Sequence, residues 1–173
     1  MTESYLQIAA NNEELARDIV ERASALGVTV STAESLTAGM IASTIADIPG
    51  ASAVLRGGAV TYCDEIKHRV LGVEQDTLDR FSAVSHQTAR EMAAGGVFTT
   101  DADACIAVTG IAGPDGGTEE KPVGLVYIAC YMKDKVKVEE YHFRGNREKV
   151  REQTVIQALD LLRRSIIKNY KKD

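Results

Sequence analysis

The sequence predicts an α/β fold: a three-layer α/β/α sandwich around a mixed, mostly parallel five-stranded sheet. Five apolar segments of strand length alternate with segments whose apolar residues recur at helical intervals, an order typical of parallel strands covered by helices. Only the connection KDK separates the last two apolar segments, which favours an antiparallel hairpin and therefore a mixed sheet. The 173 residues contain no internal repeat and no linker, so we expect one domain over residues 1–173.

The first half of the chain is expected to hold, in order, a helix, a strand, a helix, a strand and a short helix. The helices are predicted by apolar residues at helical spacing and by glycine or proline stop signals at their ends. A hydroxyl-rich turn is expected between the first strand and the second helix. The expected ranges are 11–26, 28–31, 37–48, 53–62 and 64–72.

The second half is expected to contribute two helices and three strands. Ser85 is a suitable N-cap for an alanine-rich helix over 85–99. The nearly continuous apolar run 103–110 suits a central strand that is buried on both faces. A long loop rich in glycine follows, then the hairpin strands 123–132 and 135–143 and a final helix over 146–169.

Composition argues against several classes of partner. The chain has 20 basic and 25 acidic residues, a net charge of -5, so we expect no nucleic-acid partner. It shows no cleavable apolar leader and no run of 18 apolar residues, so we expect a cytoplasmic protein without a membrane partner. Cys63, Cys105 and Cys130 lack metal-ligand spacing and are expected to be reduced thiols, with Cys63 kept as a possible nucleophile. We expect no metal and no other cofactor.

Three polar segments follow the first three expected strands. They are STAES at 31–35, TYCDEIK at 61–67 and TGIAGPDGG at 109–117. In doubly wound α/β folds, ligands bind at the carboxyl ends of the strands, where loops lead into helices. We therefore expect these segments to converge on one pocket.

Ser35 is a candidate nucleophile at the expected start of the second helix. Free N–H groups and the helix dipole there favour a developing negative charge. The alternative is that Ser35 or Thr37 only caps the helix, and spacing alone favours that interpretation. Glu34 either orients this loop or is simply an acidic residue favoured near a helix start.

A serine needs a base, and the three histidines are poorly placed to supply one. Lys67 is the alternative, because burial can lower the pKa of a lysine toward neutrality. It lies one helical turn beyond the second strand, five residues after Tyr62, so both side chains could face Ser35. Spacing alone favours a solvated helix lysine at position 67 and a strand-end tyrosine at position 62.

The loop GIAGPDGGTEEKP has too many glycines for a simple connection. It matches neither the phosphate-binding loop of NTPases nor the dinucleotide fingerprint. Its exposed N–H groups could bind a phosphate or a sugar. An Asp-Gly turn is the alternative, but it explains only Asp115 and Gly116.

Taken together, TAES.TAG, GGAVTYCDEIK and TGIAGPDGG..EKPVG closely resemble the CinA carboxy-terminal domain family over about residues 10–165. The resemblance places the family's catalytic residues on Ser35, Tyr62 and Lys67. It also implies a phosphate and ribose site built from the second helix start, the glycine loop and the FRGNR segment. The substrate-binding residues so implied are Glu34, Thr37, Gly39, Thr109, Gly110, Gly113, Asp115, Gly116, Gly117 and Arg147.

The sequence departs from the family pattern at two positions, TAG for the common TGG and GNR for the common GDR. Ala38 is expected to narrow the pocket floor, and Asn146 removes a charge beside Arg147. We expect these departures to act on substrate affinity rather than on the chemistry. No counterpart of the amino-terminal CinA domain is expected in a chain of this length.

Stand-alone members of this family include nicotinamide-nucleotide amidases, which convert nicotinamide mononucleotide to nicotinate mononucleotide and ammonia. The resemblance therefore implies a Ser-Lys-Tyr amidohydrolase of pyridine nucleotide salvage that forms a homo-oligomer, a dimer or larger. The alternatives are a catalytically silent nucleotide-binding or regulatory module and a thiol hydrolase that uses Cys63.

Overall fold

The computed structural model describes residues 3–170 and contains one five-stranded sheet with the strand order β2-β1-β3-β4-β5. The central strand β3 pairs parallel with β1 and antiparallel with β4. The β1–β2 pair is parallel and the β4–β5 hairpin is antiparallel. The predicted mixed sheet is confirmed, with two parallel and two antiparallel pairings. The strands are β1 Val30–Glu34, β2 Leu55–Val60, β3 Ala104–Gly110, β4 Leu125–Met132 and β5 Lys135–His142.

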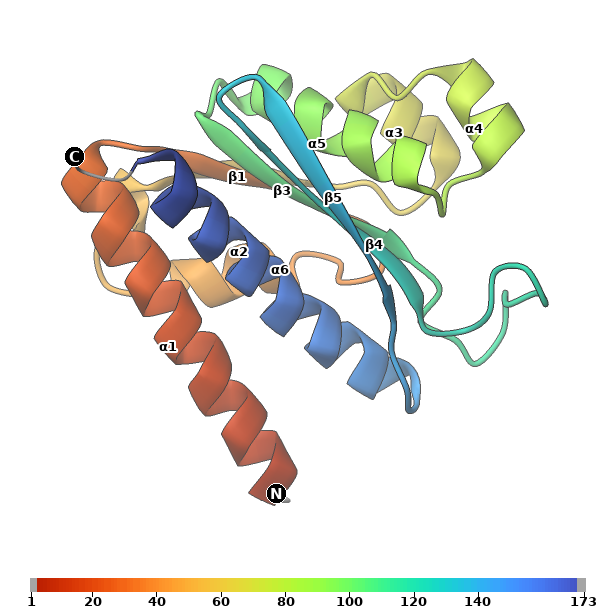
Figure 1. Cartoon of the computed structure of the whole chain (residues 1–173), viewed down its shortest axis with the longest axis horizontal. Helices are drawn as coiled ribbons and strands as arrows, with labels where there is room; N and C mark the ends of the chain where they lie inside the picture. Colours follow the sequence, from red (N-terminus) through yellow and green to blue (C-terminus); the bar gives the residue numbers. More distant parts are fainter. Residues whose placement is uncertain (1–2, 171–173) are drawn as a thin grey trace.

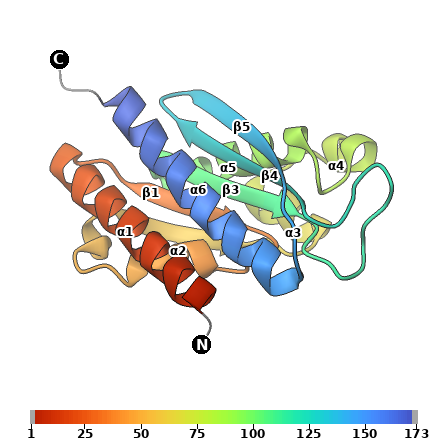
Figure 2. The same ribbon diagram turned by 60° about the horizontal axis from the view of Figure 1, so that its bottom comes forward.

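Helices cover both faces of the sheet, so the predicted three-layer α/β/α fold is confirmed (Figure 1). The helices α1, α2 and α6 pack on one face, and Figure 2 shows them from the front. The helices α3, α4 and α5 lie on the other face, where α5 contacts all five strands. The helices are α1 Glu3–Leu26, α2 Met40–Ala46, α3 Asp64–Leu71, α4 Gln75–Phe81, α5 His86–Thr100 and α6 Arg147–Asn169, with a short 3-10 turn at Ala51–Ala53.

Each face of the sheet packs against its own apolar core. The core under α1, α2 and α6 includes Ile19, Ile41 and Leu159, and the core under α5 includes Met92 and Leu71. Because β1 and β3 lie between both cores, their residues are buried on both faces, apart from Gly110 at the end of β3. Burying both faces in this way is typical of parallel central strands and holds their carboxyl ends in fixed positions.

The structure corrects the expected start of the second helix and the position of the first strand. Residues 32–34 belong to β1 rather than to the expected hydroxyl-rich turn, because β1 is hydrogen-bonded to a strand on each side. The turn comes later, at residues 36–39, and α2 begins at Met40. The backbone pairing of a central strand outweighs the low strand propensity of its polar side chains.

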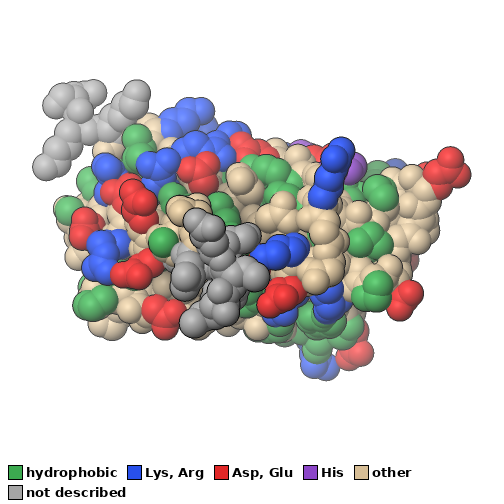
Figure 3. All heavy atoms as spheres, turned by 90° about the horizontal axis from the view of Figure 1, so that it is seen from below, with side chains coloured by type: hydrophobic (Ala, Val, Ile, Leu, Met, Phe, Trp, Pro, Cys, Tyr) green, Lys and Arg blue, Asp and Glu red, His purple; other side chains and the backbone are tan. Residues whose placement is uncertain are grey.

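Two further differences concern helices. The helix α1 begins at Glu3, eight residues before the expected start at residue 11. The charged segment 75–81, for which no element was expected, forms α4 and packs on α5. Within residues 3–170, no helix is both long and apolar enough to cross a membrane. Figure 3 shows acidic and basic side chains interspersed on the face formed by α1, α2 and α6.

Candidate active site

A cavity of about 200 Å³ lies at the carboxyl ends of β1, β2 and β3. Its lining includes residues from all three polar segments that the sequence predicts to converge, so that expectation is met. The start of α6 and the connection between α4 and α5 complete the wall. The lining residues predicted from sequence are Ser35, Tyr62, Lys67, Thr109, Gly110 and Arg147.

Ser35 and Lys67 lie side by side in this cavity. The Nζ atom of Lys67 is 3.3 Å from Ser35 Oγ and donates to the carbonyl oxygen of Thr61 at 3.0 Å. Lys67 is 1% exposed, and both hydrogen-bond partners of its amine are uncharged. A lysine amine within reach of a serine hydroxyl is the arrangement that general-base activation of the serine requires.

Burial lowers the pKa of Lys67 from its ordinary value of 10.5, and this effect outweighs the nearby Asp64 and Cys63, which act in the opposite direction. Removing the ammonium from water disfavours its charged form. The neutral amine, which carries the lone pair that accepts a proton, is therefore more populated near neutral pH than in a solvated lysine. Lys67 is not the solvated helix lysine that spacing alone favoured.

Tyr62 lies at the mouth of the cavity and is 55% exposed. Its hydroxyl accepts a hydrogen bond from Arg147 Nη2, while Arg147 Nη1 donates to the carbonyl oxygen of Gly113 at 2.9 Å. Within residues 3–170, Tyr62 makes no hydrogen bond to Ser35 or Lys67. Arg147 therefore joins the segment after β2 to the glycine loop, and Tyr62 belongs to this link rather than to the buried pair.

The carboxylate of Glu34 occupies the start of α2. It accepts hydrogen bonds from Thr37 Oγ1 at 2.7 Å and from the backbone N–H groups of Gly39, Ile41 and Ala42 at 2.9, 3.1 and 2.9 Å. Glu34 is fully buried and does not line the cavity. Glu34, Thr37 and Gly39, predicted to bind substrate, instead form an internal network that fixes the turn before α2.

This network overturns the expected oxyanion site. The N–H groups at the start of α2 are bonded to Glu34, and Ser35 lies five residues before that helix. The N–H of Ser35 donates to Val108 O at 3.1 Å, which continues the pairing between β1 and β3. The next two N–H groups, those of Leu36 and Thr37, have no hydrogen-bond partner in the described chain. They are the donors that stay available directly after Ser35 in the chain.

Close packing explains several glycines of the loop after β3. A Cβ atom would meet Val126 Cγ2 at 2.7 Å from Gly110 and Val123 Cγ1 at 2.5 Å from Gly113, which also has a φ of +79°. A Cβ on Gly117 would lie 2.8 Å from Val123 N. Contacts this short force the neighbouring atoms to move, so these glycines let the loop pack against the start of β4.

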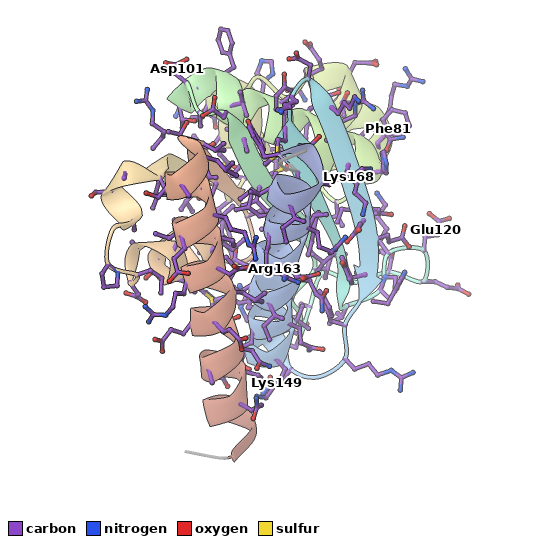
Figure 4. The ribbon with its side chains drawn as sticks, turned by 60° about the vertical axis from the view of Figure 1, so that its left-hand side comes forward. Phe81, Asp101, Glu120, Lys149, Arg163 and Lys168 are labelled. Atoms are coloured by element: carbon purple, nitrogen blue, oxygen red, sulfur yellow. The ribbon has the colours of Figure 1, made fainter. Side chains whose placement is uncertain are left out.

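Only the first part of that loop reaches the cavity. Gly110 and Ala112 line it, whereas the exposed residues Asp115, Gly116 and Gly117 do not. The loop projects beyond the sheet in Figure 1, and Glu120 within it points away from the body of the domain in Figure 4. Contacts between substrate and the tip of this loop remain a prediction.

Sequence reasoning missed the part of the cavity wall formed by Ala83 and Val84. Lys121 Nζ donates to Phe81 O at 2.6 Å, to Ser82 Oγ at 2.6 Å and to Val84 O at 2.8 Å. Thr109 Oγ1 donates to Ala83 O at 2.7 Å, so this predicted substrate-binding hydroxyl already has a partner. No motif marks these residues, because they come together only through contacts across long stretches of chain.

The other nucleophile candidates lie outside the cavity. Cys63 is exposed at the start of α3 and does not line it. Burial raises the pKa of Cys105 to about 12 and that of Cys130 to about 11, so both are inert thiols within the cores. No histidine lines this cavity.

The two departures from the family pattern have local structural roles. Ala38 has a left-handed backbone with a φ of 52° and does not line the cavity, so the expectation that it narrows the pocket floor is wrong. Asn146 caps α6 by accepting a hydrogen bond from the N–H of Lys149 at 3.0 Å. An aspartate would fill the same capping role.

A larger hollow of about 670 Å³ lies between α1 and α6. It is lined mainly by charged and amide side chains such as Glu14, Asp18 and Arg163. The lining residues include no serine, cysteine, histidine or lysine. The smaller cavity, with its serine and buried amine, is therefore the better candidate for catalysis.

Comparison with known proteins agrees with the observed fold and identifies the family of the chain. The family described as the CinA C-terminal domain matches residues 12–166. The chain is 52% identical over 156 residues to a Clostridium beijerinckii protein described provisionally as competence-damage inducible, covering 90% of this chain and 37% of that protein. It is 51% identical over 139 residues to a CinA-like protein of Endomicrobium trichonymphae, covering 80% and 32%.

Solved structures are similar over nearly their whole length. The crystal structure of the competence/damage inducible protein CihA of Agrobacterium tumefaciens has a TM-score of 0.86 at 46% identity, covering 88% of this chain and 93% of that one. A CinA superfamily protein of Klebsiella pneumoniae has a TM-score of 0.87 at 33% identity, covering 91% and 98%. The first three curated relatives are longer, and this chain spans only 37%, 34% and 34% of their lengths.

Proposed function

Because the chain belongs to the CinA C-terminal domain family, we propose that it hydrolyses nicotinamide mononucleotide to nicotinate mononucleotide and ammonia. The single observation that carries this proposal is the buried amine of Lys67, 3.3 Å from Ser35 Oγ in a cavity at the strand ends. An amide is a poor electrophile, so its hydrolysis by serine needs a base that is neutral at working pH. Burial lowers the pKa of Lys67, which makes its neutral amine more available as that base.

In the first half of the reaction, Ser35 Oγ attacks the carboxamide carbon while its proton passes to Lys67 Nζ. The carbonyl oxygen becomes an oxyanion, which the free N–H groups of Leu36 and Thr37 stabilise. Lys67 then gives its proton to the amide nitrogen as the C–N bond breaks. Ammonia leaves, and the nicotinoyl group remains esterified to Ser35.

In the second half, Lys67 Nζ takes a proton from water as the water oxygen attacks the ester carbon. Collapse of this second tetrahedral intermediate breaks the bond to Ser35 Oγ, which regains its proton from Lys67. Nicotinate mononucleotide is released, and the neutral amine is restored. One base thus serves both halves, and general acid-base help of this kind contributes roughly 10²- to 10⁴-fold to the rate.

The size of the cavity decides which part of the substrate it holds. At about 200 Å³ it is smaller than the roughly 300–1,000 Å³ typical of sites that enclose drug-sized ligands. It accommodates the pyridinium ring and its carboxamide, with the ribose and phosphate at the mouth. Arg147 lines that mouth, and its guanidinium keeps N–H groups beyond those bonded to Tyr62 and Gly113.

The substrate itself favours the active form of the base. A positive pyridinium ring beside Lys67 disfavours a second positive charge there, which keeps the amine neutral. The negative phosphate, held farther out near Arg147, offsets only part of this effect because charge interactions weaken with distance. Plain nicotinamide lacks both charges and the contacts at the mouth, so we expect it to be a poor substrate.

The test is ammonia release from nicotinamide mononucleotide, with nicotinamide as the control substrate. Ser35→Ala and Lys67→Met should each abolish release while leaving nucleotide binding measurable by calorimetry. Ser43→Ala is the matched control, because Ser43 is an exposed serine on α2 outside the cavity. Full turnover by Ser35→Ala would refute the nucleophile, and binding without turnover by the parent chain would favour a regulatory module.

We further propose that the protein works in the cytoplasm as a homo-oligomer, a dimer or larger. This rests on the resemblance to the family and not on a contact within the chain. Light scattering of the purified protein tests it, and a monomer at micromolar concentration would contradict it.

A further inference from the structure

Arg151 lies on α6, far from Ser35 in sequence, and reaches the turn that follows the serine. Its Nε donates to the carbonyl oxygen of Leu36 at 2.9 Å, and its Nη2 donates to the carbonyl oxygen of Thr37 at 3.3 Å. Arg151 does not line the cavity and is partly buried behind it. A guanidinium directed at two successive backbone carbonyls fixes the peptide groups to which those carbonyls belong.

Peptide geometry connects this contact to the reaction. In a trans peptide the C=O and the N–H of one planar unit point in opposite directions. The carbonyl of Leu36 is held by Arg151, so the N–H of Thr37, in the same unit, points to the opposite side. The carbonyl of Ser35 accepts from the N–H of Ala38 at 3.0 Å, which turns the N–H of Leu36 away in the same manner.

Both N–H groups are thus held without partners in the described chain, directly after the nucleophile. Their turn contains two left-handed residues, Ala38 and Gly39, and it depends on contacts from both Glu34 and Arg151. The planar fork of an arginine fits two neighbouring acceptors better than the single ammonium of a lysine. A charged donor on a carbonyl also polarises that peptide and makes its N–H a stronger donor.

We propose that Arg151 is a positioning residue for two oxyanion-binding N–H groups: it holds and polarises that of Thr37 directly, and it holds that of Leu36 through the bond from Ala38 N–H to the carbonyl of Ser35. This inference rests on the proposed amide hydrolysis at Ser35. It assigns Arg151 no contact with the substrate. Loss of Arg151 should therefore slow the chemical step while leaving the substrate bound as before.

The experiment compares Arg151→Met, Arg151→Lys and the control Arg163→Met in the full chain. Arg163 lies in the second half of the same helix on the side of α1, where it pairs with Asp18 and Asp160 (Figure 4). Its replacement reports the general cost of removing a partly buried arginine from α6. Steady-state ammonia release gives kcat and KM, and the thermal midpoint of each variant ensures that rates compare folded protein.

A second readout does not depend on the natural substrate. A fluorophosphonate reacts with an activated serine and places its P–O oxygen where the oxyanion forms, so the labelling rate of Ser35 reports the same donors. Ser35→Ala gives the background. Labelling is measured by intact mass at several reagent concentrations for the parent and each variant.

We expect Arg151→Met to lower kcat by about 10- to 100-fold, less than the roughly 10²- to 10³-fold loss typical of deleting an oxyanion donor. We expect KM within about twofold of the parent, because the interaction acts only in the transition state. The labelling rate should fall in proportion to kcat. Arg151→Lys should give intermediate values of kcat and of the labelling rate, since it keeps the positive charge and loses the planar fork. If Arg151→Met does not fold, Arg151→Lys provides the test.

Unchanged kcat and labelling rate in Arg151→Met would overturn the positioning role while leaving the hydrolase proposal intact. Full activity in Arg151→Lys would also overturn this role, since a positive charge would then support catalysis without the planar fork that contacts both carbonyls. If the parent protein releases no ammonia but labels rapidly at Ser35, only the proposed substrate is refuted. The labelling rates of the variants then still decide the role of Arg151. A parent whose Ser35 does not label overturns both.

Discussion

Replacing Glu34 with glutamine tests whether this buried residue supports the turn before α2 or binds substrate. In the structure, Oε2 of Glu34 accepts from Thr37 Oγ1, Gly39 N and Ile41 N, and Oε1 accepts from Ala42 N. If the amide oxygen of glutamine takes the Oε2 position, its NH₂ group faces the N–H of Ala42, donor against donor. The partly buried N–H of Ala42 then loses its acceptor, and the three remaining bonds lose their charge.

The magnitude follows from these four bonds. An unsatisfied buried donor costs about 1–3 kcal/mol, and loss of the charge weakens each remaining bond by about 1 kcal/mol. These contributions add to about 4–6 kcal/mol, and the lower desolvation cost of a neutral amide offsets part of that sum. We therefore expect Glu34→Gln to lower the free energy of unfolding by about 3 kcal/mol, which shifts the Tm of a domain of this size down by about 6–12 °C.

Urea and thermal unfolding, followed by circular dichroism, measure this loss. Glu65→Gln is the matched control, because the Glu65 carboxylate is exposed and pairs only with Arg69 on the surface of α3. Its loss should change the free energy of unfolding by at most about 0.5 kcal/mol. Glu34→Gln with parental stability and a strongly raised KM would refute the reasoning, because Glu34 would then bind substrate as the sequence analysis expects.

Three further predictions concern Lys67, Ala38 and Asn146. Burial lowers the pKa of Lys67 in the folded chain below its ordinary value of 10.5. Between these two pKa values the unfolded chain binds more protons than the folded chain, so the free energy of unfolding rises with pH. Lys67→Met should flatten this rise in urea titrations at several pH values, and an unchanged slope would contradict it. Ala38→Gly should raise the free energy of unfolding by about 0.5 kcal/mol, because glycine adopts the left-handed backbone of this position without strain. KM should stay unchanged. A lower KM would show that Ala38 restricts the pocket. Asn146→Asp should keep the α6 cap and raise the free energy of unfolding by about 0.5 kcal/mol through the helix dipole. Asn146→Ala should lower it by about 1 kcal/mol. Equal stability of the two variants in urea would exclude the cap.

The sequence by itself determined the order of most elements and the region of the site. Periodic apolar residues reported the strands and helices, because each element must bury one face or both. The positions of Ser35, Lys67 and Thr109 after successive strands predicted their convergence, since parallel strands end at the same edge of the sheet. These features depend on local spacing and on general rules of connection.

Only the tertiary structure decided what each polar residue does at that edge. Glu34 and Lys67 are both buried charged residues in the polar segments, but one caps α2 and the other contacts Ser35. Tyr62 bonds to Arg147 rather than to the buried pair, and Arg151 reaches the turn after Ser35 from the far end of the chain. Such hydrogen bonds join residues about 85 and 115 positions apart, and no local pattern encodes their distance or direction. The fold brings the groups together, and burial then sets their chemistry.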